Sequence, residues 1–76
     1  ALLRAAARGE VERLRELLAQ GVPVGVTGDA GETALHAAAL AGSATASEAL
    51  LAAGAAVDAV DARGHTPLRL AVVRGY

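Results

Sequence analysis

The chain has 76 residues, among them 21 alanines and 11 leucines, and Tyr76 is its only aromatic residue, so it favours short, closely stacked elements over one large core. Seven arginines against eight acidic residues give a net charge of −1, which argues against binding to nucleic acid or to an acidic membrane. The absence of cysteine excludes disulfides and thiolate chemistry and fits an intracellular location, cytoplasmic or nuclear.

The first 21 residues predict two helices, with a short one ending near Gly9. In the second, "EVERLRELLAQ", apolar residues recur at helical spacing and form one stripe: Val11, Leu14, Leu17 and Leu18. Glu12 with Arg15 and Arg13 with Glu16 are spaced to pair on the solvent side. We expect this helix to end before Gly21.

A second helical pair is predicted after a loop with turn-forming residues. Thr33 is a good N-cap for a helix over residues 34–41, and Gly42 is a glycine of the kind that ends helices. The following helix ends near Gly54. It has Ala44 and Ser47 where the earlier helix has Val11 and Leu14, so it should pack loosely and form a shallow, mobile patch.

The last segment predicts another loop and one more helix. The residues "DARGHTP" form a turn that runs into Thr66 as N-cap and Pro67 at the first helical position, where a missing N–H costs nothing. In the helix that follows, we expect exposed apolar residues that a further helix would cover: Leu68, Leu70 and Val72.

These segments repeat with a period of 33 residues. Displacing the chain by 33 matches 15 of the first 42 positions, including Leu2 with Leu35 and Leu68. Alanine content alone does not produce this agreement, because glycines and leucines carry most of it. A unit of helix, turn, helix and loop at this period is a solenoid.

The pattern resembles the ankyrin repeat, through "TALHAA" at 33–38, "TPLRLA" at 66–71, "ALLRAA" at 1–6 and the spacing of Gly9, Leu17, Leu18 and Gly21. This resemblance implies that His36 hydrogen-bonds the backbone of the adjacent loop and ties one unit to the next, with Arg4 and Arg69 at the corresponding positions. A metal-binding or catalytic role for His36 lacks partners, since His65 is the only other histidine.

We therefore predict an all-α ankyrin-repeat solenoid of stacked helix-turn-helix units with projecting hairpin-like loops. Its units are about 1–27 (partial), 28–60 (complete) and 61–76 (partial). Because at least about three repeats are usually needed for stability, we expect a fragment, or the ordered part, of a longer array, or an open end covered by another copy.

The resemblance also implies a protein-interaction scaffold rather than an enzyme, without cofactor or metal. The implied partner-binding residues lie on the concave face, at the loop tips and on the inner helices: Arg8, Thr27, Asp29, Ala30, Glu32, Leu40, Ala41, Val60, Ala62, Arg63, His65, Val73 and Arg74. Structural roles fall to another set: His36, Thr33, Thr66, Pro67, Gly42 and Gly54. Alternatives are a spacer or a self-assembly module that associates through open repeat ends. A further alternative is a cyclin-dependent kinase inhibitor-like binder, because "AAARGEVERLRELLAQG" resembles the opening repeat of that group.

Overall fold

The computed structural model describes residues 2–74, with side chains through Val72, as five helices joined by short turns and two long loops. The helices are α1 (Leu2–Ala7), α2 (Val11–Ala19), α3 (Ala34–Ala41), α4 (Ala44–Ala52) and α5 (Pro67–Arg74). Over this part of the chain, the strand-type pairing is limited to an isolated antiparallel bridge between Thr27 and Thr33. None of these helices is long and apolar enough to cross a membrane.

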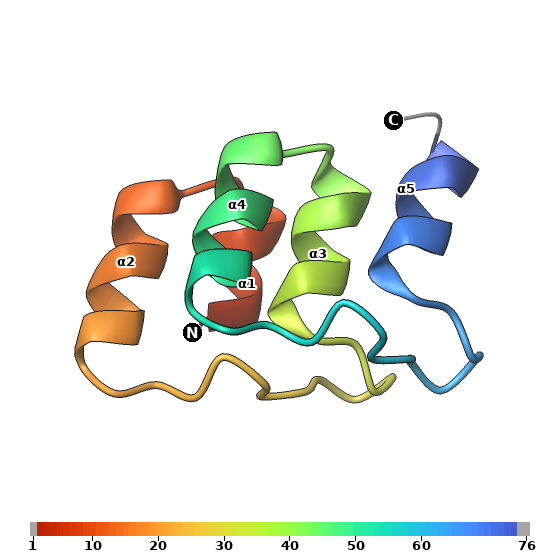
Figure 1. Ribbon diagram of the computed structural model, residues 1–76, viewed down its shortest axis with the longest axis horizontal. Coiled ribbons are helices and arrows are strands. Elements are labelled where there is room, and N and C mark those ends of the chain that lie inside the picture. The colour runs from red at the N-terminus through yellow and green to blue at the C-terminus, as the bar shows by residue number, and fades with distance from the viewer. Residues whose placement is uncertain (1, 75–76) are drawn as a thin grey trace.

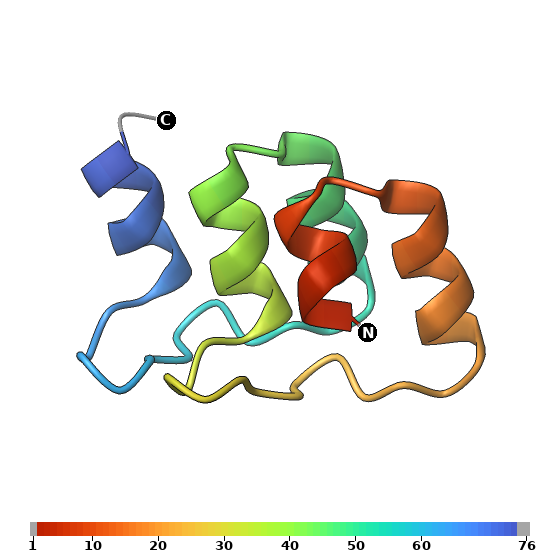
Figure 2. The same ribbon diagram turned by 180° about the vertical axis from the view of Figure 1, so that it is seen from behind.

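The helices form two layers (Figures 1 and 2). The inner layer is the row α1, α3 and α5, in which α3 contacts both neighbours, and the outer layer is α2 and α4, which contact each other. Each outer helix packs on the inner helix that precedes it, and both long loops run along one end of the helices. The predicted solenoid of stacked helix-turn-helix units is confirmed.

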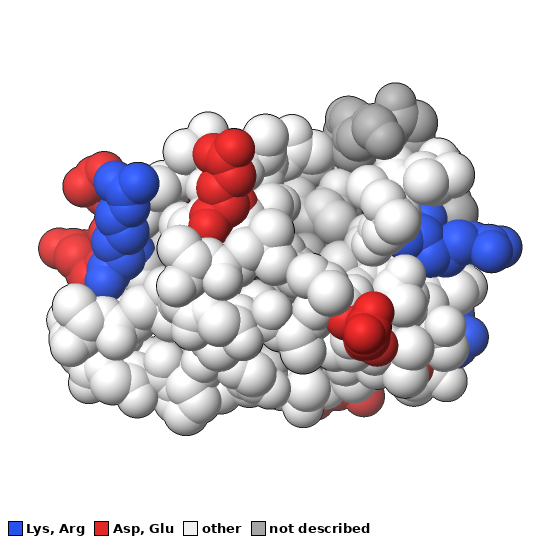
Figure 3. Space-filling view, viewed as in Figure 1, with Lys and Arg blue, Asp and Glu red and all other residues white. Residues whose placement is uncertain are grey.

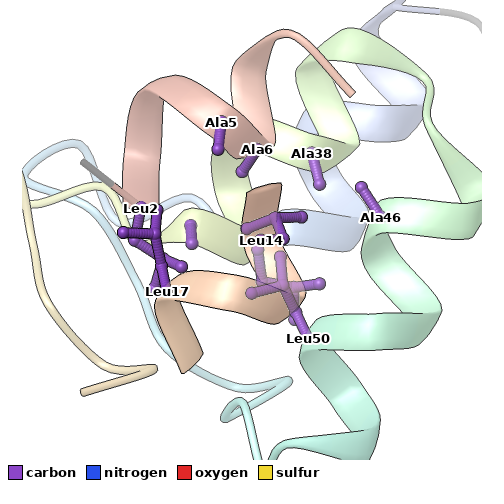
Figure 4. Close-up of a cluster of buried hydrophobic side chains, with 10 residues drawn as sticks. Leu2, Ala5, Ala6, Leu14, Leu17, Ala38, Ala46 and Leu50 are labelled. Carbon is purple, nitrogen blue, oxygen red and sulfur yellow. The ribbon is translucent and has the colours of Figure 1, made fainter. Parts of the chain in front are cut away.

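The core lies between the two layers and combines a few leucines with many alanines (Figure 4). Leu2, Leu14 and Leu50 are buried completely or nearly so, and alanines such as Ala6 and Ala38 fill the space where helices approach. Small side chains let the helix axes come close, so short helices bury a continuous apolar interface. The sequence composition therefore follows directly from the stacked architecture.

The helix boundaries follow from caps that the sequence predicts. The Thr33 hydroxyl accepts a hydrogen bond from the N–H of His36 at 3.3 Å, and the Thr66 hydroxyl accepts one from the N–H of Arg69 at 3.2 Å. At the other end of α3, Gly42 adopts a left-handed conformation with φ of 69°, which costs little for a residue without Cβ. Ser43 then caps α4 by accepting from the N–H of Ala46 at 3.2 Å.

The two outer helices differ in how firmly they are held. In α2, Leu14 and Leu17 are buried and Val11 and Leu18 pack against the core from partly buried positions. In α4, only Ala46 and Leu50 are buried. The expected i, i+3 ion pairs of α2 are present at 3.4 and 3.7 Å, but both are exposed and contribute little.

Two expectations about single residues are wrong. Leu70 is not exposed but 9% accessible, because α5 turns it toward the preceding unit, whereas Leu68 and Val72 are 73% and 62% exposed. Arg4 does not correspond to His36. Leu2 and Leu35 are both buried at the 33-residue spacing, so Leu3 takes that position and lies against the loop at Gly28, while Arg4 is exposed.

Candidate functional site

A groove of about 380 Å³ lies between the ends of the two long loops and the inner helices α3 and α5. We call it the concave groove, and its lining residues are Ala30, Glu32, Leu40, Asp61, Arg63, His65 and Leu70. Five of the residues predicted for partner binding are among them: Ala30, Glu32, Leu40, Arg63 and His65. Leu40 and Leu70 from the helices provide apolar surface, and the polar side chains come from the loops.

The two loop ends that form the walls of this groove are joined to each other. The N–H of Ala62 donates a hydrogen bond to the carbonyl oxygen of Ala30 at 2.8 Å. The approach depends on Gly31, whose φ is +75° and where an added Cβ would lie 3.1 Å from the nitrogen of Ala62. A side chain at that position would be strained and would push the two loops apart.

The second wall is a turn organised by the carboxylate of Asp61. Its Oδ1 accepts hydrogen bonds from the N–H groups of Arg63 and His65, both at 2.9 Å. The donation from His65 is the main reason that the pKa of Asp61 is lowered from 3.8; desolvation, the next largest effect, opposes it, and the Arg63 N–H lowers the pKa further. The carboxylate is therefore ionised at neutral pH and faces the groove.

His36 stabilises the same turn through a hydrogen bond from the core. Its side chain is fully buried, and its Nε2 lies 2.7 Å from the carbonyl oxygen of His65 in the next loop. Because Nδ1 accepts a hydrogen bond from the N–H of Thr33 at 3.1 Å, the proton is on Nε2, which donates to that carbonyl. The imidazole thus joins two repeat units. Within the described residues, no three His, Cys, Asp or Glu side chains gather to hold a metal ion.

The other predicted partner-binding residues are not among those that line the concave groove. Those whose side chains the structure describes are exposed: Arg8, Thr27, Asp29, Ala41, Val60 and Ala62. The side chains of Val73 and Arg74 lie outside the described part of the chain. Sequence reasoning missed Leu70 and Asp61 as lining residues. Two signals in the sequence could have found them. Leu70 lies three residues before Val73 on the same helix, which puts it on the face predicted to bind, and Asp61 lies in the predicted turn.

Two further hollows lie outside this groove. One, of about 230 Å³, is almost wholly apolar and lies between α3, α4 and α5; we call it the end groove, and Leu51, Val57 and Leu68 are among its lining residues. The other, of about 420 Å³, is open and shallow between α2 and α4, where α4 contributes Ala49 and Ala52. Figure 3 shows the outer face, on which acidic and basic side chains gather at the α2 end, single acidic side chains lie over α4 and over the loop that follows it, and basic side chains lie at the α5 end.

Comparison with known proteins agrees with the observed fold. A family profile described as ankyrin repeats (3 copies) matches residues 2–76. Among solved structures, the chain is similar to the crystal structure of the human ASB11 ankyrin repeat domain, with 40% sequence identity and a TM-score of 0.93. The match covers 99% of this chain and 34% of that chain, so the sequence spans about a third of the solved domain's length. No curated protein matches the sequence.

Proposed function

This chain belongs to the ankyrin repeat family, and from that premise we propose that it binds a partner protein through the concave groove and the loop tips beside it. Ankyrin repeats are generally protein–protein interaction modules, so the fold supports binding without specifying a partner. The observation that carries the proposal is the concave groove itself, in which an apolar floor lies between two hydrogen-bonded loop ends.

The composition of the groove suits recognition of a protein surface. Leu40 lies in the floor of the groove and is 38% exposed. A partner side chain that covers it would stabilise the complex through the hydrophobic effect. Arg63 extends from the loop and supplies donors for carbonyl or carboxylate groups. The loops are held by backbone hydrogen bonds, so their exposed side chains are free to vary with the partner.

We also propose that the chain is not an enzyme. The ankyrin repeat is a non-catalytic interaction fold. His36, the most buried polar side chain, has both ring nitrogens in structural hydrogen bonds and is not available to abstract a proton from a substrate.

The proposal is tested with two matched substitutions. Leu40 in the concave groove and Leu51 on the outer side are both leucines of similar exposure, 38% and 43%. A partner captured on the immobilised chain would be identified, purified and titrated against Leu40→Asp and Leu51→Asp by calorimetry. We expect Leu40→Asp to weaken binding about tenfold or more and Leu51→Asp to leave it within about twofold. Equal effects of the two substitutions would refute a concave binding site.

The end groove favours self-association as a second candidate function. Its apolar lining includes residues with large exposed fractions, Val57 at 57% and Leu68 at 73%. Light scattering after size-exclusion chromatography over a range of concentrations tests this directly. We expect association that Leu51→Asp abolishes and Leu40→Asp preserves, and a monomer at every concentration would refute it.

A further inference from the structure

The charges around the concave groove indicate what kind of segment it accepts. Of its lining residues, Glu32 and Asp61 carry negative charge and Arg63 carries positive charge. The hydrogen bonds that lower the pKa of Asp61 keep its carboxylate ionised at neutral pH. The groove therefore has an excess of negative charge above an apolar floor.

The arrangement of these charges is fixed by the scaffold. Both backbone N–H groups that hold Asp61 bind its Oδ1, which orients the carboxylate at the mouth of the turn. Glu32 comes from the other wall, and its side chain folds over Gly28, where an added Cβ would overlap it. The two carboxylates thus belong to two loop ends that the Ala62–Ala30 hydrogen bond holds together. Each wall of the groove therefore has one acidic residue among its lining residues.

We propose that the concave groove binds a protein segment in which a large apolar side chain is accompanied by an adjacent lysine or arginine. This inference rests on the proposed function and specifies the chemistry of the partner. The apolar side chain packs on Leu40 and Leu70, and the neighbouring cation pairs with Glu32 and Asp61. Arg63 donates to a backbone carbonyl of the same segment. Charge complementarity favours this segment over an acidic one, which would bring like charges together.

A random peptide library displayed on phage, selected against the immobilised chain, tests the inference. We expect enriched peptides to carry lysine or arginine next to an aliphatic or aromatic residue. A synthetic copy of the best peptide is then titrated against the wild-type chain, Glu32→Gln and the control Glu48→Gln, whose carboxylate lies on α4 in the outer layer. Glu32→Gln should raise the Kd about 2- to 5-fold at low salt, and Glu48→Gln should not change it. Thermal melts establish that both variants are folded.

The outcomes separate this inference from the proposed function. Peptides that lose binding to Leu40→Asp but show no enrichment of basic residues, or bind Glu32→Gln as well as wild type, overturn the inference and leave the concave binding site intact. Peptides that bind Leu40→Asp and wild type equally, or a library that yields no binder, overturn both. Enrichment of acidic residues together with weaker binding to Arg63→Gln also overturns the inference, because the groove would then select the opposite charge.

Discussion

His36 is the side chain whose removal most directly tests how the units are joined. In His36→Ala, the buried N–H of Thr33 loses its acceptor, which costs about 1–3 kcal/mol, and the hydrogen bond to the carbonyl of His65 is lost, which costs about 0.5–1.5 kcal/mol more. The His65 carbonyl is not left without a donor, because it also accepts from the N–H of Asp61 at 3.0 Å. We expect a loss of about 1.5–4.5 kcal/mol in the free energy of unfolding.

This loss is large for a chain of this size. At about 0.05–0.15 kcal/mol per residue, 76 residues correspond to roughly 4–11 kcal/mol in total. The measurement is urea denaturation followed by circular dichroism at about 222 nm, where the signal reports helix content. The midpoint and the slope of the transition are fitted for each variant. The control is His65→Ala, since His65 joins the network through main-chain atoms and its substitution should change stability by less than about 0.5 kcal/mol.

A second variant separates hydrogen bonding from packing. Leu3 occupies the position equivalent to His36 in the first unit, so leucine is compatible with the helix there. His36→Leu fills most of the space but leaves the Thr33 N–H without an acceptor, and it should therefore still be destabilised by at least about 1 kcal/mol. If His36→Leu were as stable as the wild type, the hydrogen bonds of His36 would contribute nothing and our account of the join would be wrong.

Three further predictions concern the loops and the outer layer. Gly31→Ala should cost about 1 kcal/mol more in unfolding free energy than Gly54→Ala, because both have positive φ but only the first places a Cβ 3.1 Å from another backbone atom; equal losses would contradict this. The lowered pKa of Asp61 means that its contribution is fully present above about pH 4 and is lost as the pH falls through the folded-state value. Asp61→Asn should therefore destabilise the chain more at pH 6 than at pH 3, and a constant difference across a pH series of denaturation curves would be inconsistent with that linkage. Amide hydrogen exchange should be faster in α4 than in α2, since α4 buries one alanine and one leucine, whereas α2 buries two leucines and packs Val11 and Leu18 against the core as well. Slower exchange in Thr45–Ala52 than in Glu10–Leu18 would refute this.

The sequence determines the repeat architecture because its signals are local and periodic. Thr33, Thr66 and Gly42 occupy helix ends where their side chains or backbone freedom meet a specific need, so their positions predict the boundaries. The 33-residue period then requires that successive units stack, because each unit alone cannot bury its apolar face. The helix ends and the stacking of units therefore follow from the sequence without any information on contacts between residues far apart in the chain.

The predictions for Leu70 and Arg4 are wrong because a shift of one residue along a helix changes the direction in which a side chain points. The sequence predicts that both Leu70 and Val72 are exposed, because no helix follows them. The packing of α5 on α3 buries Leu70 and leaves Val72 exposed. The motif letters align Arg4 with His36, but the 33-residue period aligns Leu3 with His36, and the buried pair Leu2 and Leu35 shows that the period sets the helical phase. Residues that line a groove together, such as Leu40 and Asp61, come from different elements, so their proximity depends on tertiary packing that a linear pattern does not contain.

The proposed concave binding site would couple recognition to stability through the loop that follows α4. The same carbonyl of His65 that accepts the buried proton of His36 belongs to the turn that presents Asp61 and Arg63 to the concave groove. A substitution that weakens the join between units therefore also loosens one wall of the groove, even though it touches no partner. Because Leu40 and the exposed side chains of the loops make no such join, they are free to change specificity at little cost in stability. Recognition can diverge at those positions only as long as the buried hydrogen bonds beneath them are kept.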